Sequence, residues 1–319
     1  MPPRWLSALI VASWLAATGW LFWHELWPNW RPGEPPTFYI DLVEEVQNPD
    51  RLKTTWNVQR QMKEDEQLRD IFRATTWVDY KPEADTFTLH AELTRKGAYV
   101  KEENTVPLLD LLDVVIKSMT SEYRVTRTGQ LRGLGARVNL IKVPPKSKGK
   151  DPKPNVTAEE NAELLLEGQV RGDQFFAHCS LGGTLMPKEL KMDLPPTSMS
   201  HNASVLLPLH PVNRIHGLRL GQSWRQPLVD PFRDSFGSVL GSGGVRHLNA
   251  RVLPQPQVLK RDDGSETTCL VIEYEEEGQF AGRTWVEQDS ERVEQQEAIR
   301  DGDTWFMKRD NPRKAIKRP

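Results

Sequence analysis

The sequence predicts a mainly β protein of the α+β class. We expect a curved antiparallel sheet or half-barrel with one or two short helices, preceded by one N-terminal transmembrane helix. Two observations predict the sheet: apolar and polar residues alternate with period two from Thr37 onward, and short turns, several with Gly, join successive alternating segments. A third observation, the uncharged apolar run at residues 5–23, predicts the transmembrane helix.

The apolar run WLSALIVASWLAATGWLFW contains 19 residues without a charge. At about 1.5 Å per residue its helix would be roughly 28 Å long, close to the hydrocarbon thickness of a bilayer. Trp residues near both ends of the run suit the headgroup region. We therefore expect a single-pass membrane anchor at residues 1–27, with Arg4 on the cytoplasmic side and the bulk of the chain periplasmic.

A cleaved signal peptide is the alternative interpretation of the same run. Ala17-Thr18-Gly19 has the small-x-small pattern of a cleavage site, and an apolar stretch precedes it. Both interpretations put the bulk of the chain outside the cytoplasm, but only the first keeps it attached to the membrane.

Composition divides the rest of the chain into a stalk, one β-rich domain and a tail. Residues 28–36 (PNWRPGEPP) are a Pro-rich stalk, and the β-rich domain spans 37–310. Inside it, residues 142–160 hold a Lys- and Pro-rich stretch that we interpret as a mobile hairpin tip, because the segments on both sides resemble partner strands. Residues 311–319 form a basic tail. The net charge of −2 for the whole chain gives no reason to expect nucleic acid as a partner.

Hairpins are predicted in order along the domain. Alternating segments flank Thr128-Gly129, then Arg171-Gly172-Asp173, then residues 261–264. A meander of three segments, 282–288, 291–299 and 303–309, closes the domain. Leu270, Ile272 and Tyr274 are expected to share one face of their strand, with the glutamates between them on the other face.

Evidence for helices inside the domain is sparse. Thr105 is a capping residue, and Pro107 lies in the first turn of an apolar segment, so residues 105–115 predict a short helix. The segment 63–72 fits either a helix or a strand. Cys179 and Cys269 both lie in apolar strand-like segments, which leaves open whether they form a disulfide or two buried thiols.

The usual signatures of catalysis and of metal binding are missing. The seven His form no HxH, HExxH or HxxxH pair, and there is no GxSxG motif. The Gly-rich residues 237–244 lack the Lys-Ser/Thr of a phosphate-binding loop, so they predict a flexible loop. We therefore expect no cofactor, no metal and no catalytic residue.

Four short motifs resemble a known family. They are Thr55-Trp56-Asn57-Val58, residues 125–131, the turn 217–224 (GLRLGQSW), and the closing segment 285–296. The pattern resembles a family of uncharacterised exported or membrane-anchored bacterial β proteins, which is similar in turn to the half-barrel of periplasmic lipoprotein carriers (LolA-like). The resemblance implies a fold and a cellular compartment, and it supplies no catalytic residue.

The leading functional hypothesis is a non-catalytic, membrane-tethered β-domain that binds an apolar ligand or a protein partner at the cell envelope. An open curved sheet exposes an apolar face that helices, lipid or protein must cover. The candidate residues for lining that face are aromatic: Trp56, Trp77, Trp224, Trp285 and Trp305. One alternative is a structural component of a membrane-associated complex. The other is an envelope hydrolase, which would require a nucleophile beside one of the His.

Overall fold

The computed structural model of this 319-residue chain describes most of the predicted domain and one N-terminal helix. The described residues are 4–23, 53–63, 67–81, 83, 85–96, 114–126, 130–142, 160–186, 188–198, 213–228, 246–300 and 302–310. The predicted stalk, the loop between Lys142 and Glu160, the Gly-rich loop 237–244 and the basic tail lie outside them.

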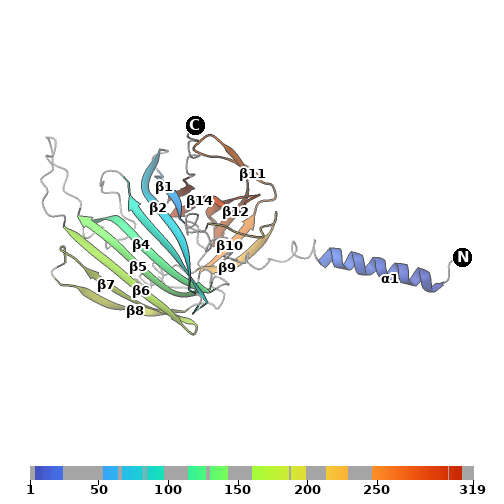
Figure 1. Ribbon diagram of the computed structural model, residues 1–319, viewed down its shortest axis with the longest axis horizontal. Coiled ribbons are helices and arrows are strands. Elements are labelled where there is room, and N and C mark those ends of the chain that lie inside the picture. The colour runs from blue at the N-terminus through green and yellow to red at the C-terminus, as the bar shows by residue number, and fades with distance from the viewer. Residues whose placement is uncertain are drawn as a thin grey trace.

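The N-terminal helix α1 spans Arg4–Leu21 and stands apart from the sheet (Figure 1). Its aromatic side chains are solvent-exposed; Trp14 and Trp20 retain 65% and 69% of their surface. Among the described residues, no helix combines the length and the apolar character that crossing a membrane requires. The transmembrane helix predicted at residues 1–27 is therefore not supported.

In the described part of the chain, fifteen strands follow α1. Their bounds are β1 Thr54–Gln61, β2 Leu68–Lys81, β3 Thr86–Arg95, β4 Val114–Thr126, β5 Leu131–Lys142, β6 Asn161–Arg171, β7 Gln174–Gly182, β8 Leu190–Ser198, β9 Ser223–Leu228, β10 Arg246–Val252, β11 Gln257–Lys260, β12 Glu266–Glu276, β13 Gln279–Glu287, β14 Val293–Arg300 and β15 Asp303–Arg309.

All the strands belong to one antiparallel sheet, in the order β8-β7-β6-β5-β4-β3-β2-β1-β15-β14-β13-β12-β10-β9, with β11 added beside β12. Pairing of β1 with β15 joins the two ends of the domain in the middle of the sheet. Among the described strands, β8 and β9 are the two edges. The prediction of a mainly β, antiparallel sheet is confirmed.

Each predicted hairpin is present. Strands β4 and β5 flank Thr128-Gly129, β6 and β7 meet at the turn of Gly172 and Asp173, and β11 and β12 flank residues 261–264. Gly172 and Gly264 have φ of 62° and 81°, which Gly adopts without the steric cost of a side chain. The closing meander is β13–β15.

The predicted helix at residues 105–115 is wrong at its end, because Val114 and Val115 begin β4. Both are β-branched and buried, which favours a strand. Residues 105–113 lie outside the described part. The ambiguous segment 63–72 resolves at its second half as the start of β2. Cys179 and Cys269 are buried free thiols and form no disulfide.

The sheet bends around one apolar face. Trp56 on β1 and Trp224 on β9 have five strands between them in the sheet, yet both belong to one buried cluster. They can share a cluster only if the sheet curls toward the face that carries them. Figure 1 shows this bend, with β4–β8 on one side and β9–β12 on the other. We call the inner surface the concave face and the outer surface the convex face.

Apolar side chains line the concave face along the whole sheet. Cross-strand partners point to the same side, so the register extends this face from β1 through Ala74 and Leu93 to Met119 on β4. A second cluster, which includes Leu134 and Leu166, continues it over β3–β8. The alternation predicted for Leu270, Ile272 and Tyr274 is confirmed: they face the concave side.

Candidate functional site

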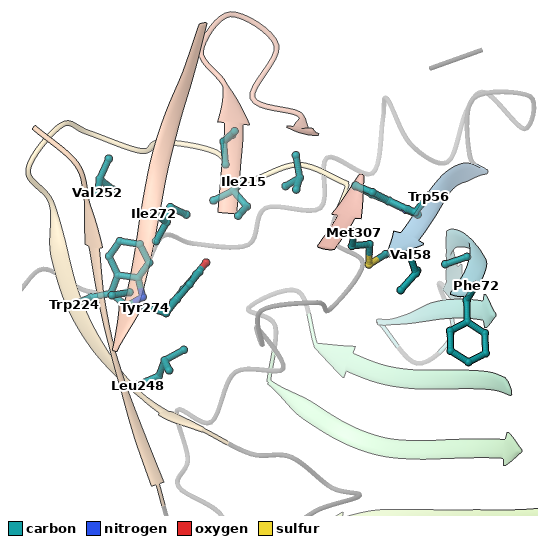
Figure 2. Close-up of a cluster of buried hydrophobic side chains, with 14 of the residues drawn as sticks. Trp56, Val58, Phe72, Ile215, Trp224, Leu248, Val252, Ile272, Tyr274 and Met307 are labelled. Carbon is teal, nitrogen blue, oxygen red and sulfur yellow. The ribbon is translucent and has the colours of Figure 1, made fainter. Parts of the chain in front are cut away.

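Three of the five predicted Trp lie on the concave face. Trp56 and Trp224 are 0% and 3% exposed, and Trp305 packs against the same cluster. Figure 2 shows Trp224 and Tyr274 on one side of the curl, opposite Trp56, Val58 and Met307 on the other. The concave face of β9–β15 is therefore the candidate site.

The other two Trp lie on the convex face. Trp77 stacks on His90 with ring centroids 4.8 Å apart, and the ammonium of Lys53 lies 4.9 Å from its ring. Trp285 packs with Cys269 and Val271, where residues around β11 cover the sheet. The structure does not bring these two rings to the candidate site.

One row of cross-strand partners on the concave face alternates large rings with small side chains. In register it runs from Trp305 on β15 to Ala298, Gly282, Tyr274, Ala250 and finally Trp224 on β9. Only a methyl group and a hydrogen separate Trp305 from Tyr274 in this row. Gly282 is required here, because a Cβ at this position would lie 2.2 Å from the carbonyl oxygen of Glu297 on β14.

Uncharged polar groups lie beside this row without partners. Thr284 on β13 pairs in register with Gln296 on β14, and both residues are buried, at 0% and 3% exposed. Within the described part of the chain, Thr284 Oγ1, Gln296 Oε1 and Trp305 Nε1 are buried and have no hydrogen-bond partner. Proteins pair the great majority of their buried polar atoms, so three unpaired atoms on neighbouring strands are unusual.

The phenol of Tyr274 adds a fourth polar group. Burial raises the pKa of Tyr274 to about 12, and the nearby hydroxyl of Thr284 offsets part of this rise without reaching hydrogen-bonding geometry. Tyr274 is therefore a neutral hydroxyl at physiological pH. We call Tyr274, Thr284, Gln296 and Trp305 the polar row.

An ion pair ends the polar row at β1. Arg60, directly opposite Trp305, is 8% exposed and bonds through Nε to Asp303 at 2.8 Å. The guanidinium also lies 5.3 Å from the Trp305 ring. Because the two opposite charges lie together, this end of the row carries no net charge.

Residues 213–222, which we call the strap, cross one end of the curl. At one end of the strap, the carbonyl oxygen of Asn213 accepts bonds from Val293 N at 2.9 Å and from Arg309 at 2.8 Å. At the other end, Gln222 O accepts a bond from Val252 N at 2.8 Å. The motif GLRLGQSW begins in this segment and ends in β9, and positive φ at Gly217 and Gly221 forms its turn.

A cavity of about 190 Å³ lies between the strap and the ends of β12 and β13. Ile215, Leu218 and Leu220 line it from the strap, and Leu270 and Val286 from the sheet. Val286 is two residues from Thr284 on the same face of β13, about 7 Å at roughly 3.3 Å per residue. The cavity thus lies next to the polar row.

Carboxylates surround the cavity, and each has partners. Glu291 accepts bonds from His216 Nδ1 and from Gly217 N, and the His216 bond is the main cause that lowers the Glu291 pKa. At Glu287, burial raises the pKa, but bonds from Ser290, Thr267 and Arg261 outweigh it and hold the pKa at about 2. Glu291 therefore ties the strap to the turn after β13.

The described His bear on the hydrolase alternative. Contacts to carboxylates are made by His90 (Asp79 and Glu122), His178 (Asp193) and His216 (Glu291). Within the described residues, no hydrogen bond joins a His to a Ser, Thr or Cys, and no group of His, Cys, Asp and Glu is arranged to hold a metal ion.

Sequence reasoning singled out Trp305 as a candidate, but it did not single out Thr284 or Gln296 or place the four residues in one row. Tyr274, Thr284, Gln296 and Trp305 come from four strands, and only the register brings them together. One sequence signal could have indicated these residues. A polar residue two positions from an apolar residue lies on the same face of a strand, as Thr284 does before Val286 and Gln296 before Ala298.

No family model and no curated protein matches the chain. Among solved structures, the chain is similar to a β-barrel-like protein of the domain of unknown function DUF1849 from Brucella abortus, at 10% identity and a TM-score of 0.41, covering 81% of this chain and 95% of that one. The likeness to lipoprotein carriers stays a prediction.

Proposed function

We propose that this protein is a non-catalytic binding domain that holds an apolar ligand on the concave face of its sheet. The observation behind this proposal is the cavity under the strap, which five apolar side chains line together with Glu287, Gln288 and Glu291. Ligand sites are typically concave and mostly apolar, with a few polar groups that fix orientation. Ligand sites usually have volumes of roughly 300–1,000 Å³, so this cavity suits a narrow chain or one end of a larger ligand.

The test is saturable binding of an uncharged apolar dye, N-phenylnaphthylamine, to the full-length protein. Leu218→Trp should fill the cavity and weaken dye binding by about tenfold, the equivalent of roughly 1.4 kcal/mol. Val258→Trp is the matched control, because Val258 is 65% exposed on β11, away from the cavity. Absence of saturable binding, or equal affinity of the Leu218→Trp variant, would contradict the proposal.

We propose the cell envelope as the location. The apolar run predicts export, and α1 exposes its apolar side chains, as Trp14 and Trp20 show. N-terminal sequencing of the mature protein and protease treatment of intact spheroplasts test this: a chain that starts at Trp20 indicates a cleaved signal peptide, and full protection from protease without lysis contradicts the location.

A second candidate function, a structural component of a membrane-associated complex, is favoured by edge strand β8. Leu190 and Met192 on its concave side are 55% and 37% exposed, while Pro195 and Pro196 remove two backbone donors from its second half. If this edge binds a protein, Met192→Glu should eliminate a crosslinked partner in native membranes and leave dye binding intact. An unchanged crosslinking pattern would exclude this edge.

A further inference from the structure

We propose that the polar row is a subsite for the uncharged, oxygen-bearing head group of a single-chain amphiphile. The inference rests on the proposed function, since it assumes that an apolar chain occupies the concave face. It adds which head group the protein selects and which side chains select it.

The polar row has hydrogen-bonding capacity that the described chain does not use. Thr284 Oγ1 can donate and accept, Gln296 Oε1 accepts, and Trp305 Nε1 donates. All three atoms are buried without partners in the described part of the chain. A head group with a carbonyl and a hydroxyl would supply the missing acceptor and donors, so it would recover the desolvation cost that these atoms bear.

The absence of net charge at the polar row decides which head groups it can bind. The polar row has no charged member, and the neighbouring Arg60 and Asp303 neutralise each other at 2.5 Å. A carboxylate, phosphate or ammonium head would lose its hydration here without gaining a counter-charge from the row itself, which costs far more than burying a neutral ester or hydroxyl. The row therefore selects against charged heads.

The polar row lies beside both the apolar concave face and the cavity under the strap. In register, Thr284 faces Gln296, and Trp305 is diagonal to Gln296 across β14 and β15, a spacing of roughly 7–8 Å. Along β13 the row adjoins Val286, which lines the cavity under the strap. An amphiphile can thus place its head at the row and its chain along the apolar concave face.

The experiment is calorimetric titration of the full-length protein with four twelve-carbon probes: monolauroylglycerol, laurate at pH 8, dodecylamine and 1-dodecanol. We expect the two neutral oxygen-bearing probes to bind about tenfold or more tightly than the two charged ones. Thr284→Val with Gln296→Leu should weaken monolauroylglycerol binding about tenfold and leave laurate binding unchanged.

Thr88→Val is the matched control. Thr88 is 3% exposed and its hydroxyl also lacks a partner in the described residues, but it lies on the convex face, in register with Asp79 and Arg124. The Thr88→Val variant should bind all four probes with the same affinities as the wild type. Equal affinity for all four probes, or an unchanged preference in the Thr284/Gln296 double variant, would overturn the inference and leave the proposed function intact. Failure of all four probes to bind would overturn both.

Discussion

Thr284 and Gln296 face each other across β13 and β14 on the concave face, and their side-chain oxygens have no hydrogen-bond partner in the described chain. Elsewhere on this face a buried pair is satisfied: Trp56 Nε1 donates to Thr76 Oγ1 at 3.0 Å. The fold itself therefore satisfies the Thr76 hydroxyl but not the Thr284 hydroxyl. This contrast separates a structural hydroxyl from one available to a ligand.

The two threonines should respond oppositely to the same substitution. Thr284→Val keeps the shape and removes an unpaired buried hydroxyl, so the free energy of unfolding without ligand should rise by about 1 kcal/mol. Thr76→Val leaves the buried indole of Trp56 unpaired, so it should cost roughly 1–3 kcal/mol. The midpoints of urea unfolding of the two variants, compared at the same m-value, test both expectations. Destabilisation by Thr284→Val would mean that its hydroxyl has a partner in the folded protein.

Gly282 permits β13 and β14 to approach each other. In Gly282→Ala the new Cβ would meet Glu297 O at 2.2 Å, so the strands must separate, at a cost of roughly 1–3 kcal/mol. Gly135→Ala on β5 is the control: its Cβ would meet nothing within 4 Å. That variant should be neutral or gain about 0.5 kcal/mol, since Gly weakens a strand. Thermal unfolding of both variants tests this, and equal effects would contradict the close approach.

Glu287 should make stability depend on pH in acid. Its pKa is held at about 2, below its ordinary value of 4.5, so the ionised form is stabilised in the folded state. That stabilisation is complete above about pH 4.5 and is lost as the pH falls toward 2. The shift corresponds to at most roughly 3 kcal/mol, and to about 1–2 after solvent screening.

The measurement for Glu287 is the pH dependence of the unfolding free energy in wild type and in Glu287→Gln. Between pH 4.5 and 2 the wild type should lose about 1–2 kcal/mol more than the variant. Parallel curves would show that the bonds from Arg261, Thr267 and Ser290 do not stabilise the ionised carboxylate.

Much of the fold was predictable because its rules are local. The alternation of Leu270, Ile272 and Tyr274, and Gly at the turns, define strands and hairpins without any tertiary information. The faces of the five Trp were not predictable. Trp285 and Val286 flank a register shift with β14, and such shifts change which residues share a face.

The polar row was beyond sequence reasoning for a similar reason. Taken one at a time, Thr284 and Gln296 have the sequence pattern of ordinary polar residues on the exposed face of a strand. Only the curl of the sheet, which brings β9 and β1 around one interior, buries them. Curvature of this kind depends on twist and bulges summed over many strands, which no single segment encodes.

Glu291 should control opening of the strap, because one carboxylate accepts bonds from both His216 Nδ1 and Gly217 N, the latter at 3.1 Å. Glu291→Gln removes the charge while keeping an acceptor. The pair is partly exposed, so its loss should cost about 1 kcal/mol and raise the exchange rate of the Gly217 amide about fivefold.

Hydrogen exchange followed by mass spectrometry of a peptide covering the strap provides the measurement. Asp193→Asn is the matched control, since it breaks another His–carboxylate contact, to His178 on β7 at 2.9 Å, far along the sheet. That variant should leave exchange in the strap unchanged. If the strap is the entrance to the concave face, Glu291→Gln should also speed dye release without changing the lining of the cavity by Leu218 and Val286. Unchanged exchange in Glu291→Gln would show that the backbone bonds at Asn213 and Gln222 hold the strap without this carboxylate.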